Sequence, residues 1–402
     1  MKKLIYVLMF LSFFPFVSFI NIGTDTQPYA FVIAVMIILL NRNYKIPKLI
    51  APLFLVSALS VVIFIIFGKY GMLELRSLFN YLSITVISYA SYLGIKRIGG
   101  VDEKYFKIII NIWFIVGLVQ KFIKSDFLLF LVAGGRTSVG RGITNLTSEP
   151  SFYGYMIIFA LLFVLDFKEK RNLYIVNLLV QLFLFSQSAV SMVYLGIYVG
   201  LLLGKYILSL KISNIRKVVI IALLFVGSLT MYFNMYPNSR ATVLLGSILS
   251  NPQEVYSADA SVRSRFNHIY IPITEAFRSY LMPNGYSRAL EVFGYRRIMS
   301  GYGAGIYELG IIGIIMVINI FLIVYRATYH RNNKLNSVFL TIIMFSAIQL
   351  ASPILAFYIG YVLNLNKSKK NKVMINKKIL SEELGKKRNK LGKYNLSVNL
   401  RM

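Results

Sequence analysis

Long apolar runs without charged residues recur along almost the whole chain, and they constrain the fold more than any other feature. Runs such as Leu49 to Phe67 and Leu78 to Ile95 are long enough, as helices, to cross a hydrocarbon layer about 30 Å thick. Strand-type alternation is absent, and a helix satisfies its own backbone hydrogen bonds inside lipid. The 402 residues are 57% hydrophobic with a mean hydropathy of +0.66, which argues against a soluble domain. The sequence therefore predicts an all-α, polytopic membrane helix bundle.

Counting the apolar blocks predicts about eleven or twelve transmembrane helices. The blocks are 4–20, 29–40, 49–67, 78–95, 106–122, 152–167, 173–185, 189–203, 218–233, 302–325, 337–350 and 354–365. Two breaks leave the number open, because Ser186-Gln187-Ser188 and Ala351-Ser352-Pro353 are compatible with a tight turn between helices or a kink within one. We expect residues 1–366 to form the transmembrane domain.

Basic residues predict the orientation of the chain in the membrane. Lys and Arg recur in every second loop and in the C-terminal tail, and such residues are retained on the cytoplasmic side. Both termini are therefore expected in the cytoplasm, with a basic tail over 367–402. Two external segments remain, about 124–150 and 234–301, and we expect the second to hold one or two amphipathic helices over the membrane domain.

Charge and composition also exclude several kinds of chemistry. The net charge of +29 would suggest nucleic acid in a soluble protein, but its densest cluster is the tail, which would lie against anionic lipid headgroups. Nucleic acid is therefore not an expected partner. The chain has no cysteine and two histidines, so we expect no disulfide, no thiol nucleophile, no metal site and no cofactor.

The first external segment combines glycines with arginines. Residues 134–142 hold four glycines together with Arg136 and Arg141, and such a loop can form an anion nest whose arginines grip phosphate. The Lys-Ser/Thr pair of a nucleotide-binding loop is missing. Glu149 follows, directly before Pro150, at the expected start of a helix. Its carboxylate is compatible with helix capping, or with orienting or deprotonating a sugar hydroxyl.

The second external segment carries Arg as its only basic residue type. Arg makes planar, bidentate contacts with phosphate and stays charged, so a cluster of external arginines favours a bound anion such as a diphosphate. Snorkelling into lipid headgroups is the competing explanation for each side chain taken singly. The candidate ligand-binding residues are Arg263, Arg265, Arg278 and Arg288. His268 in the same segment is a candidate general base.

The chain carries four short motifs in and after its external segments, namely Ser148-Glu149-Pro150-Ser151, Ser261-x-Arg263, Pro283-Asn284-Gly285-Tyr286, and the glycine-rich stretch 301–313 that contains Glu308. Together they resemble the repeat-unit polymerases of O-antigen, capsule and exopolysaccharide synthesis, within the O-antigen ligase superfamily. The resemblance covers nearly the whole chain in layout.

The resemblance implies a metal-independent glycosyltransferase in a bacterial cytoplasmic membrane. The growing glycan would move from undecaprenyl diphosphate onto a lipid-linked repeat unit at the outer leaflet. Arg263 would contact the diphosphate, and Arg141 or Arg136 would assist. A chain-length regulator and a flippase are the protein partners that such an enzyme would have.

Two alternatives stay open at this point. An O-antigen ligase would have a histidine shortly before the glycine-rich stretch, where this chain has Ile298-Met299-Ser300. A flippase or transporter of the lipid-linked unit would have ionisable residues along its spans, and the spans here are nearly free of charge.

Overall fold

The computed structural model describes residues 1–18, 26–41, 45–67, 71–136, 142–208, 212–251, 256, 260–286, 292–294, 298, 300–329, 334–345 and 352–365. Within these ranges the protein is helical, as the sequence predicts, and its β-type pairing is limited to an isolated bridge between Val17 and Val132. The basic tail 367–402 and two predicted ligand-binding residues, Arg141 and Arg288, lie outside the described residues.

Four helices in the described part of the chain are long and apolar enough to cross a membrane. They lie within α4 (Met72–Ile98), α5 (Glu103–Phe122), α8 (Ala189–Leu208) and α9 (Ile212–Met235). The most apolar window of α4 is 78% buried within the protein, whereas that of α9 is 6% buried. Helix α4 is therefore central, and α9 presents its apolar side chains to the surroundings, as a helix at a lipid-facing edge would.

Shorter apolar helices complete the bundle. They are α2 (Tyr29–Leu39), α3 (Ala51–Phe67), α6 (Pro150–Val164), α7 (Arg171–Val180) with a π-helical turn over Gln181–Ser186, α15 (Ile311–Tyr329), α16 (Lys334–Phe345) and a last helix over Pro353–Leu365. Between α7 and α8, Gln187 adopts a left-handed conformation with φ 46°. The first of the two breaks that the sequence left open thus separates two helices.

Two predicted apolar blocks are wrong in their extent. Helix α1 (Lys2–Phe13) ends seven residues before Ile20, because Pro15 follows and the residue before a proline is kept out of the helical conformation. The block predicted over 302–325 divides into α14 (Gly301–Leu309) and α15. Gly310 separates them with φ 60°, a conformation that glycine adopts at little steric cost.

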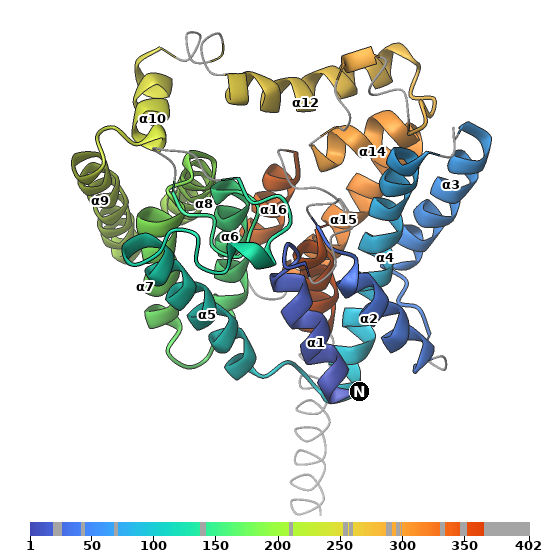
Figure 1. The fold of residues 1–402 in the computed structure, drawn as a ribbon, viewed down its shortest axis with the longest axis horizontal. Coiled ribbons are helices and arrows are strands. Elements are labelled where there is room, and N and C mark those ends of the chain that lie inside the picture. The colour runs from blue at the N-terminus through green and yellow to red at the C-terminus, as the bar shows by residue number, and fades with distance from the viewer. Residues whose placement is uncertain are drawn as a thin grey trace, which may run out of the picture.

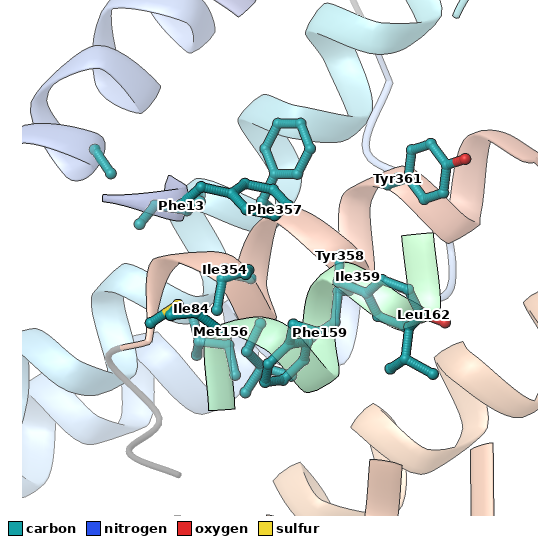
Figure 2. Packing of buried hydrophobic residues seen from close by; sticks show 14 of the residues in the cluster. Phe13, Ile84, Met156, Phe159, Leu162, Ile354, Phe357, Tyr358, Ile359 and Tyr361 are labelled. Atoms are coloured by element: carbon teal, nitrogen blue, oxygen red, sulfur yellow. The ribbon is translucent and has the colours of Figure 1, made fainter. Parts of the chain in front are cut away.

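The last helix, Pro353–Leu365, lies in the middle of the hydrophobic core. Phe357 and Tyr358 are almost completely buried, and Figure 2 shows them among side chains from α1, α4 and α6. The ring centroid of Phe163 in α6 is 5.2 Å from that of Tyr358 and 5.0 Å from that of Tyr361. Tilted and edge-on aromatic pairs of this kind stabilise a core beyond the area that they bury.

In the described part of the segment 234–301, where the sequence predicts one or two amphipathic helices, α10 (Arg240–Ser250) and α12 (Ala260–Arg278) are the two longest helices. Helix α10 begins at Ser239, whose hydroxyl accepts a hydrogen bond from the Thr242 N–H at 3.1 Å. Helix α12 packs against α14. In Figure 1, α12 lies across one end of the bundle, and the N-terminus lies at the opposite end. We call these the α12 end and the N-terminal end.

Candidate functional site

Buried hydrogen bonds hold the segment before α6 against α5. The Oε1 atom of Gln120 accepts from the Asn145 N–H at 2.8 Å, and the Asn145 Nδ2 atom donates to the Trp113 carbonyl at 2.7 Å. Asn145 has φ 54°, a left-handed conformation in which asparagine is enriched. The Ile143 N–H donates to the Phe185 carbonyl at 2.9 Å. These contacts leave little freedom to the chain that leads to Glu149.

Glu149 is the N-cap residue of α6 by its backbone, with Pro150 as the first helical residue. Its carboxylate accepts no hydrogen bond from a backbone N–H of the first turn of α6. Instead, the carboxylate pairs with Arg136 at 3.3 Å and accepts from the Ser151 hydroxyl at 3.2 Å. The Arg136 side chain is 66% exposed, so this ion pair contributes only about 0–1 kcal/mol. Glu149 is positioned by the backbone and stays available at the protein surface.

A pocket of about 100 Å³ lies at the α12 end, beside Glu149. Three helices begin at it, namely α6, α8 and α10, and the N-terminal half of α12 closes it. Its lining comprises Gly142, Glu149, Pro150, Ser151, Gln187, Ser188, Ala189, Val190, Arg240, Ala241, Leu244, Val262 and Arg265. Helix N-termini carry partial positive charge and free N–H groups, so the pocket favours an anion even before its arginines are considered.

Close approach of α6 and α8 shapes one wall of this pocket. A Cβ atom at Gly154 would collide with the side chain of Ser191, and one at Gly142 would collide with the Ser186 carbonyl. The Ser186 hydroxyl also donates to the Pro150 carbonyl at 3.0 Å. Glycine at these positions therefore permits the two helix starts and the preceding loop to meet.

Two donors in the lining have no acceptor among the described residues. The Nη1 atom of Arg265 and the Nε2 atom of Gln187 are buried, and neither has a hydrogen-bond partner there. Buried polar atoms are almost always hydrogen-bonded in proteins, and an uncompensated buried guanidinium is costly. A ligand with several acceptor oxygens and negative charge, such as a phosphate or diphosphate, would satisfy both donors.

The structure separates the predicted site residues into two groups. Glu149 and Arg265 line the pocket. Arg136 is not part of the lining, but it forms an ion pair with Glu149. Arg263 is exposed on α12 and does not line the pocket. Arg278, in the last turn of α12, pairs with Glu275.

His268 belongs to the second group, because it is 4% exposed and does not line the pocket. Its carbonyl lies so close to Gly303 that a Cβ atom there would be crowded. Its segment of α12 therefore faces α14, and nothing places its imidazole next to Glu149.

Two pocket residues, Arg240 and Gln187, were not singled out by sequence reasoning. Ser239 before Arg240 is a typical N-cap residue, and this signal could have placed Arg240 at a helix start facing the site. Gln187 stands in the polar break between two apolar blocks. Its left-handed backbone has no marker in the sequence, because a glycine or asparagine would be the usual residue in that conformation.

A second buried polar cluster brings together motifs that are far apart in the chain. The Tyr81 hydroxyl donates to Glu308 Oε2 at 2.6 Å, and the Gly285 N–H donates to the Glu308 carbonyl at 3.2 Å. The Tyr286 hydroxyl donates to the Ser60 carbonyl at 2.8 Å. The cluster ties the segment 283–286 to α3, α4 and α14, and its residues do not line the pocket. Its contacts support a structural role.

Comparisons of the chain with protein-family models, with curated proteins and with solved structures found no match.

Proposed function

We propose that the protein is a polysaccharide repeat-unit polymerase of a bacterial cytoplasmic membrane, with both termini in the cytoplasm and the α12 end facing outward. It would transfer a growing glycan from undecaprenyl diphosphate onto the sugar hydroxyl of a lipid-linked repeat unit. The observation that carries this proposal is the pair of buried donors without acceptors, on Arg265 and Gln187, in the same pocket as the Glu149 carboxylate. The motif resemblance supports the same reaction.

The pocket offers groups suited to holding the diphosphate of the donor. The guanidinium groups of Arg265 and Arg240 supply positive charge, and the first turns of α6, α8 and α10 supply helix-dipole charge. During transfer the bond between the anomeric carbon and the diphosphate oxygen breaks, and the electron pair stays on the diphosphate. Fixed cations stabilise this developing charge more strongly in the transition state than in the ground state.

Glu149 is the group that we propose as the general base. The acceptor hydroxyl oxygen forms the new bond to the anomeric carbon, and its proton passes to the Glu149 carboxylate. Arg136 and Ser151 hold that carboxylate in place through the contacts at 3.3 and 3.2 Å. His268 was the other candidate base, and its position on α12 outside the pocket favours Glu149.

A deletion strain provides the test of the proposed reaction. Lipid-linked glycans are extracted, separated by size and assigned to a membrane face by their accessibility to an impermeant label. The polymerase proposal expects single repeat units to accumulate on the outer face. Long unligated chains there would instead indicate a ligase, single units on the inner face would indicate a flippase, and an unchanged profile would refute all three.

Complementation then tests the assignment of Glu149. Glu149→Gln keeps the size and hydrogen-bonding capacity of the side chain but removes its basicity, so polymer should be lost while the protein still inserts. Asp126→Asn is the matched control, because Asp126 is an acidic residue of the same external segment whose side chain is 67% exposed and does not line the pocket. Normal polymer with Glu149→Gln would rule out Glu149 as the base.

A further inference from the structure

Helix α12 carries a row of exposed aromatic rings on the face opposite its packed side. Phe266, Tyr270 and Phe277 are 59%, 69% and 59% exposed. At about 100° per residue they fall within an arc of about 40°. Tyr280, in the turn that follows α12, is also exposed, at 91%. We call Phe266, Tyr270 and Phe277 the aromatic row.

The other face of α12 is occupied by the rest of the protein. His268, Pro272 and Ala276 are buried there at four-residue spacing, and α12 packs against α14. Because α12 lies across the end of the bundle (Figure 1), the face opposite α14 points away from the helices that would span the membrane. A helix that binds a membrane surface buries its apolar face in lipid, so this arrangement favours a ligand on the water side.

The chemistry of the row fits a carbohydrate chain. An exposed aromatic face carries partial negative charge, and the flat C–H face of a pyranose ring carries partial positive charge, so the two stack. The Tyr270 hydroxyl can hydrogen-bond to sugar hydroxyls. Tyr256 adds another ring, edge-on to Phe266 at 6.2 Å, while its hydroxyl donates to Asn267 at 2.9 Å.

The row starts where the candidate site ends. Arg265 lines the pocket, and Phe266, the next residue, begins the row on the outer face of the same helix. At about 1.5 Å per residue, Tyr270 lies about 6 Å and Phe277 about 16 Å farther along the axis of α12. A glycan attached to a diphosphate at Arg265 could therefore follow the row without leaving the surface of α12.

We propose that the aromatic row is a binding track for the glycan that is attached to the diphosphate in the pocket. This inference rests on the proposed function, and it adds a site for sugars several residues away from the reacting bond. A longer glycan contacts more rings than a shorter one, so it is retained longer between additions. The row thus favours extension of an existing chain over starting a new one.

The test compares the purified wild-type protein in lipid nanodiscs with a triple variant, Phe266→Ser, Tyr270→Ser and Phe277→Ser. The probes are oligosaccharides of increasing length, released from the surface polysaccharide of the wild-type strain, and binding is measured by saturation-transfer NMR. The wild-type protein should bind longer probes more tightly. The triple variant should lose this length dependence, with affinity for the longest probe falling roughly tenfold, and its polymer in cells should be shorter.

Two control proteins separate loss of the rings from general damage. Phe266→Tyr, Tyr270→Phe and Phe277→Tyr together keep all three rings and should behave like the wild type. Phe130→Ser removes an aromatic side chain that is 82% exposed outside the row, and it should leave length dependence unchanged.

Each remaining outcome counts against a particular claim. Wild-type length dependence and polymer length in the triple variant would overturn the track while leaving the polymerase proposal intact. An unchanged glycan profile in the deletion strain would overturn the proposed function, and the track with it. Broadening of the Tyr270 ring signals by spin-labelled lipids would show that the row lies in the membrane interface, which would also overturn the track.

Discussion

Replacing Arg265 by Ala is expected to weaken diphosphate binding far more than replacing Arg263 by Ala. Only one residue, a serine, separates the two arginines in the sequence. Their side chains lie about 160° apart around the axis of α12. Arg265 lines the pocket with a buried Nη1 atom, whereas Arg263 is exposed outside it. Hydrogen bonds to charged groups contribute about 1.5–3 kcal/mol, which corresponds to a roughly 10- to 150-fold loss of affinity. An exposed charge contributes about 0–1 kcal/mol, or less than about fivefold.

The assay is isothermal titration of geranyl diphosphate, a short water-soluble prenyl diphosphate, into each protein in nanodiscs. Thermal unfolding of the ligand-free proteins is measured in parallel. Because Arg265 places a charged donor in a buried position without a protein acceptor, Arg265→Ala should leave the unfolding midpoint unchanged or raise it. Arg265→Lys should bind with intermediate affinity, since lysine keeps the charge but loses the planar fork.

Two results would refute this reasoning. A larger loss of affinity for Arg263→Ala than for Arg265→Ala would support the placement that the family resemblance implies and remove the pocket from the argument. A lowered unfolding midpoint with unchanged affinity for Arg265→Ala would show that Arg265 stabilises the fold and does not bind the ligand.

Three further substitutions test the architecture around the site by unfolding measurements in detergent. Tyr81→Phe removes the buried donor to Glu308 at 2.6 Å and should lower the free energy of unfolding by about 1–3 kcal/mol; no change would contradict the buried pairing. Gly154→Ala should cost about 1–3 kcal/mol by forcing α6 from α8, whereas Gly200→Ala, with open space around it, should cost little, and equal effects would contradict the close approach. Asn145→Ala loses its hydrogen bond to Trp113 and should cost about 1–3 kcal/mol; unchanged stability would contradict a role for this bond in holding the segment before α6.

The sequence predicted the kind of fold because helix length and lack of charge are direct constraints on a chain in lipid. The helical character is confirmed, while the number of spans and their orientation stay predictions. The errors fall where local backbone preferences interrupt an apolar run. Pro15 ends α1, and Gly310 separates α14 from α15. A hydropathy profile does not mark either residue as the end of a helix.

The candidate site was only partly predictable, because composition identifies residue types and not the directions of side chains. Counting external arginines selected Arg263, Arg265 and Arg278 equally. Only the packing of α12 on α14 decides that Arg265 turns toward the helix starts and that Arg263 does not. Gln187 could not be found in this way, since its contribution depends on how the end of α7 meets the start of α6.

The two ends of the bundle satisfy their charged groups differently, and this contrast is the physical reason to place the chemistry at the α12 end. At the N-terminal end, where Tyr105 of α5 stacks on Tyr6 of α1, Glu103 accepts from the Lys168 N–H at 2.8 Å and pairs with Lys107 at 3.3 Å. Those charges are satisfied by the protein itself. At the α12 end, Arg265 keeps a buried donor without an acceptor in the described chain, beside a carboxylate and three helix starts. A buried guanidinium nitrogen without an acceptor destabilises the ligand-free protein, so a bound anion is the simplest compensation for its presence there.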